Sequence, residues 1–519
     1  MSESTLEAPP ISAAPEVHEE QRAHEPVPWT LRGFVRRHPW WTTAMILVAI
    51  AIALVAWAGT RPSFDAYGWL AWGYQTIHGT LDLGGAPSWK PLPLLFTAPF
   101  AIFGHYELWL WMITAVTVAL AGAVFAGRIA FRLTGGAAAG ADPDPIRRYA
   151  PIVAAIFAGG AVLGLEDYMH YILSVQSDPM LVTFGLAALD MFLLGRFRWT
   201  LVLGVLAAIG RPEFFPFVGV FMIWAWFKVP SMRWWLIGGV LVIAFMWFGI
   251  PTITNHRPNI AGELAQKSPR ALRRNQLFGT IGRFGELHYL PVWIAAAFAI
   301  VLAAARRNWV VLGMAAGAVV WVIVEIAFAY HGWPALPRYM FEPAAVCAVL
   351  AGVGVGWALA ELPRLRAGVP QWIGVPVAAV LVIALIPGAI HRLHVERKDL
   401  KHERGRAHQI ALLQTTASRL GGISHIQNCG QPVTDVGYVS ALAYLFHRNV
   451  GHVGGFQQGV QKAELRNPRL AKVLFYPVTH GGWKVRPLHT RATQIARCRS
   501  LRASYVVTRG HPAGVLLHR

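Results

Sequence analysis

Long apolar runs recur along this chain up to residue 390, and they constrain its fold more than any other feature. They lie at residues 42–59, 108–130, 149–165, 178–195, 199–227, 234–250, 291–305, 309–329, 339–359 and 372–390. A transmembrane helix needs roughly 17–25 mostly apolar residues, which most of these runs provide. Only 14% of the residues are charged, against about 25% in soluble domains. We therefore expect an all-α polytopic membrane protein.

The number and direction of the spans follow from one broken run and from the basic links between runs. The run 199–227 is interrupted by "GRPEFF", so we expect it to cross twice, as two short helices, giving about eleven transmembrane helices. The short basic links contain Arg147 with Arg148, Arg196 with Arg198, Lys228 with Arg233, Arg306 with Arg307, and Arg364 with Arg366. The positive-inside rule places such links in the cytosol.

One apolar stretch, residues 90–104, decides whether all these links can share one side. If it crossed, every basic link from Arg147 onward would lie outside. If it is a short re-entrant or interfacial helix, all of them stay in the cytosol. We prefer the second arrangement. It predicts a multi-pass plasma-membrane protein with its N-terminus inside and its C-terminal domain extracytoplasmic.

The composition divides the chain into three parts. Residues 1–40 are polar and Pro-rich and read as a disordered cytosolic tail, and residues 41–390 form the transmembrane module. Residues 391–519 hold no run long enough to span, and we expect a small extracytoplasmic α/β or mixed domain. That domain carries 20 Lys and Arg against 5 acids, which favours an anionic partner. On the outer side this partner is a lipid or a glycan and not nucleic acid.

Two further features concern the outer side. Cys429 and Cys498 are the two cysteines of the C-terminal domain, and an external compartment would permit a disulfide between them. The external loop 251–290 is itself basic, with Lys267, Arg270 and Arg283 among its residues. Either this loop breaks the positive-inside rule, or it faces a polyanion such as a phosphorylated lipid carrier.

Polar residues gather on the predicted outer face, where ionisable groups at the ends of spans suggest a functional site. The candidates are Asp65, Trp89, Lys90, Glu166, Asp167, His170, Asp178, His331 and Arg338. A carboxylate among aromatic planes suits sugar chemistry with a general base, and Lys or Arg suits a phosphate. Arg211 and Glu213 lie at an outer turn by the same count.

Other chemistries stay open at this point. Asp65 and Asp178 could be the carboxylate pair of a glycoside hydrolase. Asp167 and His170 are three residues apart and Glu166 adjoins them, so a divalent cation site is an alternative. No Gly-rich phosphate loop of the nucleotide-binding kinds is present, and we expect neither ATP nor NAD.

The order of these elements resembles the GT-C superfamily of integral-membrane glycosyltransferases, which use polyprenyl-phosphate-linked sugars, with mannosyl, arabinosyl and aminoarabinose transferases among them. An acidic residue follows the first span in "SFDAYGW", and a lysine-proline helix ends in Phe-Gly in "WKPLPLLFTAPFAIFGHYELW". A later span begins with an acid in "SVQSDPMLVTFGLAALD", and an Arg-Tyr opens another in "LPRYMFEPAAVCAVL". The resemblance covers roughly residues 40 to 360.

The resemblance implies a role for each matching residue. Asp65 would be the general base for the acceptor hydroxyl, and Asp178 a second acidic group that shapes the site. Lys90 and Arg338 would hold the donor phosphate, with His331 assisting. Apart from the resemblance, we expect Glu166, Asp167, His170 and Trp89, which lie on the same predicted outer face, to bind the substrate or acceptor. Many members carry paired acids in the first loop, whereas Asp65 stands alone here, so a metal-dependent variant is in doubt.

The expected reaction is a single inverting displacement at the anomeric carbon, from a polyprenyl-phosphate donor to an extracytoplasmic lipid, glycan or protein acceptor. The alternatives are a transporter or flippase of a lipid-linked sugar, with "GRPEFF" as a broken helix on its pathway, and a non-enzymatic scaffold whose basic domain binds the cell wall.

Overall fold

The computed structural model describes residues 38–84, 89–136, 140, 142–266, 270–272, 274–361, 371–456, 472–478, 482–488, 504–506 and 514–516. Residues 1–46 and 47–519 form two compact units. Of the first unit, the structure describes only the start of one helix. The predicted tail, apart from residues 38–40, therefore lies outside the described residues.

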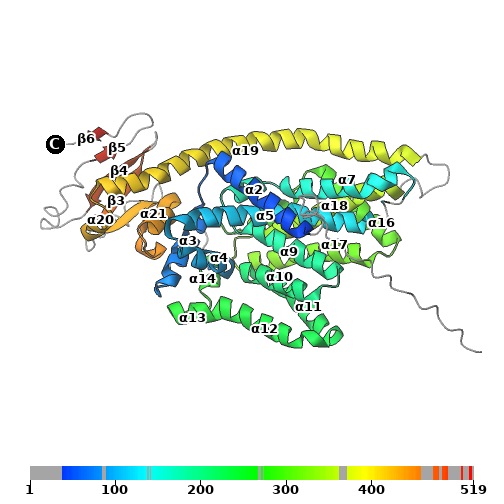
Figure 1. Cartoon of the computed structure of the whole chain (residues 1–519), viewed down its shortest axis with the longest axis horizontal. Coiled ribbons are helices and arrows are strands. Elements are labelled where there is room, and N and C mark those ends of the chain that lie inside the picture. Colours follow the sequence, from blue (N-terminus) through cyan, green and yellow to red (C-terminus); the bar gives the residue numbers. More distant parts are fainter. Residues whose placement is uncertain are drawn as a thin grey trace, which may run out of the picture. The chain divides into compact units, whose positions relative to one another are not determined.

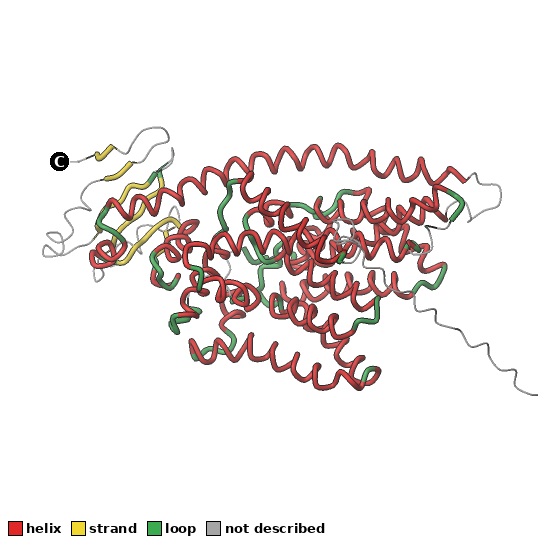
Figure 2. The backbone as a smooth tube through the Cα atoms, in the orientation of Figure 1, coloured by secondary structure: helices red, strands yellow, loops and turns green. Residues whose placement is uncertain are grey.

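Every predicted apolar run is mainly helical and the broken run lies in two helices, while residues 245–249 of the run 234–250 form a π-helix, η4 (Phe245–Gly249). These helices are α2 (Pro39–Ala58), α5 (Glu107–Leu133), α7 (Pro145–Leu163), α9 (Asp178–Leu193), α10 (Phe197–Gly210), α11 (Phe215–Lys228), α12 (Arg233–Ala244), α16 (Leu290–Ala305), α17 (Trp309–Tyr330), α18 (Phe341–Glu361) and α19 (Gly374–Arg419). Figure 2 shows how far helix dominates the described chain. The predicted polytopic helical fold is confirmed.

The number of spans depends on helix length. Within the described residues, seven helices are long and apolar enough to cross a membrane, or eight if one bent pair counts as a single span. That pair is α15 (Gln276–Gly285) with α16, bent by 97°. The helices α9, α10 and α11 have 16, 14 and 14 residues, which is short for a span. The count of about eleven therefore stays a prediction.

The stretch that decided the topology forms a short helix, α4 (Pro91–Ala101). Its 11 residues rise about 16 Å, roughly half the hydrocarbon thickness of a bilayer. Pro91 starts the helix without losing a hydrogen bond, because the first amide of a helix has no partner within it. The length agrees with the prediction that residues 90–104 do not cross.

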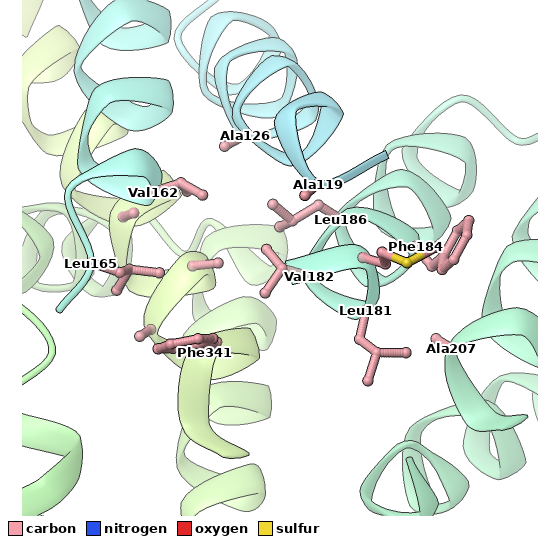
Figure 3. Packing of buried hydrophobic residues seen from close by; sticks show 14 of the residues in the cluster. Ala119, Ala126, Val162, Leu165, Leu181, Val182, Phe184, Leu186, Ala207 and Phe341 are labelled. Carbon is pink, nitrogen blue, oxygen red and sulfur yellow. The ribbon is translucent and has the colours of Figure 1, made fainter. Parts of the chain in front are cut away.

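Helix α18 is the centre of the packed module. Of the window that would span the membrane, 89% is buried inside the protein, and α18 packs against α5, α7, α9, α16, α17 and α19. Its Gly352 and Gly354 allow close approach, since an added Cβ would lie 2.5 Å from the Ala154 oxygen and 2.0 Å from the Ala295 oxygen. Small residues at helix contacts are typical of membrane proteins. Figure 3 shows side chains of α5, α7, α9 and α18 packed together.

The C-terminal part contains the strands. A four-stranded sheet runs in the order β2-β1-β3-β4, with β1 (Gln431–Asp435) parallel to β2 (Gly454–Phe456) and β3 (Lys472–Pro477), and β4 (Trp483–Leu488) antiparallel to β3. A two-stranded sheet joins β5 (Ser504–Val506) to β6 (Gly514–Leu516). With α20 (Ile423–Cys429) and α21 (Val439–Leu445), these strands confirm a small mixed domain.

The predicted start of this domain, at residue 391, falls inside a continuous helix. Helix α19 runs for 46 residues, and Figure 1 shows it as one long yellow helix that reaches the strands. Its Leu413 and Ala417, with Leu420 directly after its end, belong to the apolar core of the C-terminal domain. Cys429 is disulfide-bonded, and its predicted partner, Cys498, lies outside the described residues.

Candidate active site

Asp65 is placed by a tight connection between two helices. Helix α2 ends at Ala58, and Gly59 takes the left-handed conformation with φ of 61° that favours glycine. Helix α3 (Phe64–Ile77) follows, with Asp65 in its first turn. The Asp65 side chain is 23% exposed. It therefore keeps an accessible carboxylate next to a buried interior.

The connection is hydrogen-bonded to the segment that leads to Asp178. The Thr60 hydroxyl donates to the Leu173 oxygen at 2.8 Å, and the Ser63 amide donates to the Ser174 oxygen at 2.9 Å. The Gln176 side chain donates to the Ser63 hydroxyl at 2.6 Å. These bonds fix the backbones that carry the two acids relative to each other.

Asp178 is the centre of a buried ionic cluster. The Asp178 side chain is 0% exposed, and the residue is the first of helix α9. Arg211 donates to Asp178 Oδ1 through Nη2 and, at 3.1 Å, through Nε. Lys90 Nζ lies 3.4 Å from the same oxygen, and Arg338 Nη1 lies 3.9 Å from Asp178 Oδ2. One carboxylate thus organises three cations.

Arg338 joins the two acids. It lies in a 3-10 helix, η5 (Pro337–Met340), and its Nη2 is 3.4 Å from Asp65 Oδ2. Its guanidinium carbon lies 5.6 Å from the centre of the Tyr339 ring and 5.7 Å from that of Tyr171. Lys90 Nζ similarly lies 5.9 Å from the Trp69 ring centre. Aromatic faces therefore surround the cations and stabilise them. The structure brings together four of the candidate residues, Asp65, Lys90, Asp178 and Arg338.

Two members of the cluster, Arg211 and Glu213, received no role from the sequence. Helix α10 ends at Gly210, and a 3-10 turn, η2 (Pro212–Phe214), separates it from α11. Arg211 Nη1 lies 3.1 Å from Glu213 Oε1, and the Arg211 guanidinium stacks 3.9 Å above the Tyr339 ring. The signal was visible, because charged residues interrupt an apolar run at "GRPEFF". The sequence pattern alone indicates a turn here, but it does not show which residues Arg211 and Glu213 contact.

The residues assigned to the acceptor lie elsewhere. Glu166 pairs with Arg392 of α19 at 2.8 Å. Asp167 has a left-handed backbone with φ of 58°, and burial, followed by the nearby Glu166 carboxylate, raises the pKa of Asp167. His170 lies in α8 (Tyr168–Leu173) and stacks edge-on against Tyr171. These three side chains gather beside α19, and the structure does not bring them into the Asp65–Asp178 cluster.

Trp89 and His331 also make their described contacts away from the cluster. Trp89 is 1% exposed, and its indole donates to the Met246 oxygen at 3.0 Å. It therefore packs the start of α4 against the π-helical turn η4 (Phe245–Gly249). His331 Nδ1 lies 2.8 Å from the Ala327 oxygen of its own helix. Contact of Trp89 with the acceptor and of His331 with a phosphate stays a prediction.

An apolar cavity of about 640 Å³ adjoins the cluster, between α9, α10, α11, α17 and α18. Phe214, which follows Glu213 directly, lines it together with Trp321. Glu342 also lines it, and neither of its carboxylate oxygens has a hydrogen-bond partner among the described residues. The cavity is therefore continuous in sequence and in space with the Arg211 turn. Among the described residues, no group of three or more His, Cys, Asp or Glu is arranged to hold a metal ion.

No protein-family model matches the chain, and no curated protein matches it in sequence. The solved structures to which the chain is similar include ArnT from Cupriavidus metallidurans. In the apo state it is 15% identical, with a TM-score of 0.46, over 83% of this chain and 92% of that chain. Bound to undecaprenyl phosphate it is 15% identical, with a TM-score of 0.48, over 92% of this chain and 97% of that chain. At 15% identity these likenesses do not show what this chain does, so its function is inferred from its own side chains.

Proposed function

We propose that this protein is a membrane glycosyltransferase of the GT-C type. It moves a sugar from a polyprenyl-phosphate carrier to an extracytoplasmic lipid, glycan or protein acceptor, by one inverting displacement. The observation that carries the proposal is the Arg338 bridge between an accessible carboxylate, Asp65, and the buried cations around Asp178.

The environments of the two acids give them different roles. Asp178 is fully buried and has Lys90, Arg211 and Arg338 around it, so its ionised form is held strongly and it is a poor proton acceptor. Asp65 is partly exposed, and the described structure gives its carboxylate one ion-pair partner, Arg338 at 3.4 Å. Asp65 can therefore meet an acceptor hydroxyl as general base, while Asp178 positions the cations. A two-carboxylate hydrolase is disfavoured for the same reason, because both acids would have to reach one bond.

Charge accounting agrees with a phosphate leaving group. The ion pairs join three cations, Lys90, Arg211 and Arg338, to three acids, Asp65, Asp178 and Glu213. The donor is a phosphodiester with one negative charge, and its phosphate gains a second when the bond to the sugar breaks. At the same step the acceptor proton passes to Asp65. The neutralised Asp65 leaves Arg338 free to stabilise the new phosphate charge.

The apolar cavity offers a place for the polyprenyl chain. Its wall is built from side chains such as Phe214, Phe217, Phe221 and Trp321, and a hydrocarbon chain gains free energy by leaving water for such a surface. Glu213 binds Arg211 while the next residue lines the cavity. A donor with its chain in the cavity would thus direct its phosphate toward the cluster.

The test uses purified protein in liposomes with polyprenyl-phosphate sugars of several kinds and a mixed pool of envelope lipids and glycans. Asp65→Asn keeps the shape of the side chain and removes its basicity, so transfer should fall by at least about a thousandfold, while binding of polyprenyl phosphate is retained. Glu286→Gln, at an exposed acid of α15's end, is the matched control and should transfer at the wild-type rate.

Transfer by Asp65→Asn at the wild-type rate would show that Asp65 is not the base. Movement of the donor across the bilayer by Asp65→Asn, with no transfer by the wild type, would favour the flippase.

A further inference from the structure

Two arginines of α19 hold the short connection that carries Asp65. Arg404 donates from Nε to the Ala58 oxygen and from Nη2 to the Trp57 oxygen, both at 2.8 Å. Arg406 donates from Nη2 to the Pro62 oxygen at 2.8 Å and from Nη1 to the Arg61 oxygen at 3.4 Å. Two guanidinium groups thus bind four backbone oxygens on either side of Gly59.

These bonds satisfy groups that the local backbone cannot. The last carbonyls of a helix have no partner within it, and a cation near them also interacts favourably with the helix dipole. Trp57 and Ala58 are the last residues of α2, and Arg404 binds both of their oxygens. Arg61 and Pro62 lie between the helices, where no helical bond is available. Asp65 follows three residues after Pro62.

The same stretch of α19 is fixed in the C-terminal domain. Gln409, less than one turn after Arg406, donates to the Gly482 oxygen at 2.8 Å and accepts from the Trp483 indole at its backbone oxygen, also at 2.8 Å. Leu413 belongs to the apolar core of that domain. A displacement of the domain would therefore be transmitted along α19 to Arg404 and Arg406.

The C-terminal domain also contacts α3 directly. Ala71 of α3 belongs to the domain's buried apolar cluster, and Phe64, the neighbour of Asp65, packs against it. The Tyr67 and Tyr444 rings lie 5.7 Å apart, and the Asn449 side chain donates to the Asp82 oxygen at 2.6 Å. The C-terminal domain therefore contacts α3 directly and also binds the chain on both sides of it, through α19 before α3 and through Asn449 after it.

We propose that Arg404 and Arg406 are positioning residues for Asp65, and that through them the C-terminal domain is a working part of the active site. The inference rests on the proposed function for its catalytic meaning. The two arginines touch neither the cluster nor the cavity in the described structure. They act by holding the backbone of residues 57–62, while Thr60 and Ser63 tie that backbone to the Asp178 segment.

The experiment measures local backbone opening and kinetics on the same full-length variants. In the double variant Arg404→Ala with Arg406→Ala, the amides of residues 60, 61 and 63–66 should exchange with deuterium at least about tenfold faster. The kcat for transfer should fall by about tenfold to a hundredfold, because displacement of a catalytic group by 1 Å costs about that much, and the donor KM should stay unchanged. Arg397→Ala, an exposed arginine of the same helix, is the matched control and should alter neither quantity.

A conservative double variant separates positioning from folding. In Arg404→Lys with Arg406→Lys the positive charges remain, but an ammonium lacks the planar fork that binds two oxygens at once, so kcat should recover only in part. Unchanged exchange at residues 60–66 in the alanine variant would overturn the proposal, whatever the protein's activity. Faster exchange with unchanged kcat would overturn it as well. Faster exchange in a protein that transfers no sugar at all would instead refute the proposed function and leave the backbone contact standing.

Discussion

At the scale of single residues, the site depends on how unequally Asp65 and Asp178 are buried. Three cations surround Asp178 and are themselves mostly buried, with Lys90 13%, Arg211 3% and Arg338 12% exposed. If Asp178 lost its charge, these cations would be left in a low-dielectric interior without their shared partner. Asp65 is 23% exposed and has a single cation at 3.4 Å, so the loss of its charge would not leave several buried cations without a shared partner.

Substitution at the two acids should therefore separate stability from activity. Asp178→Asn should lower the free energy of unfolding by about 3 kcal/mol, the usual cost of removing one member of a buried ion pair. Asp65→Asn should change it by less than about 1 kcal/mol while it abolishes transfer. Thermal unfolding in detergent, followed by the loss of tryptophan signal, measures both. Equal destabilisation by the two substitutions would show that Asp65 is as structural as Asp178.

The sequence predicted four members of this cluster because each adjoins the end of an apolar run. Asp65, Lys90, Asp178 and Arg338 all lie near helix starts, and a single topology places them on one side. Arg211 was placed on that side too, but nothing local indicates that its guanidinium reaches Asp178, 33 residues earlier. Glu166 and His331 show the opposite outcome, since a common side of the membrane does not imply contact.

At the scale of helices, close backbone contact limits what α18 can carry. A Cβ at Gly354 would lie 2.0 Å from the Ala295 oxygen of α16, and backbone atoms cannot move aside cheaply. Gly354→Ala should therefore destabilise the protein by about 2 kcal/mol or more, as overpacking does. Gly160→Ala is the control, because a Cβ there meets nothing within 4 Å, and Ala is favoured over Gly in a helix. Melting temperatures of the two variants in the same detergent test the contrast. Equal temperatures would mean that the α16–α18 contact is loose.

The contact between α3 and the C-terminal domain should respond to pH. The Tyr74 ring stacks on His78 at 4.0 Å and on His447 at 4.2 Å. Burial, and to a smaller extent the nearby His78, lowers the pKa of His447 below its ordinary 6.5. The neutral ring is thus favoured in the docked state. The stabilisation is fully present above about pH 6.5 and is lost as the pH falls below that value, because the undocked histidine then takes up a proton first.

Hydrogen exchange of residues 443–449 between pH 5 and pH 8, corrected for the intrinsic rate, measures this response. Protection should decrease toward pH 5 in the wild type, and His447→Phe, which keeps a stacking ring, should remove the decrease. A decrease of the same size in His447→Phe would assign the response to another group.

At the scale of the whole molecule, local and non-local features differ in how well the sequence predicts them. Apolar runs depend only on neighbouring residues, and every predicted run is mainly helical. The boundary at residue 391 depended on a change in composition, but α19 continues through that change for more than seven further turns. The docking of Tyr444, His447 and Asn449 on α3 and the residues after it joins positions more than 360 residues apart, so no local pattern could predict it.

The sidedness of the C-terminal domain is the last link between fold and function. If Asp65 and the C-terminal domain that contacts α3 lie outside the cytosol, a donor carried by a polyprenyl chain reaches the site from the outer leaflet.

A cysteine in place of Tyr476, which is 42% exposed on β3, should then react with a membrane-impermeant maleimide in intact cells. A cysteine at Ser231, in the turn between α11 and α12, should react only after the membrane is opened. Of the three native cysteines, Cys347 is buried and Cys429 is disulfide-bonded, so these two should give little background. Labelling in the reverse order would put the active site in the cytosol, where a nucleotide sugar and not a polyprenyl-linked one would be the expected donor.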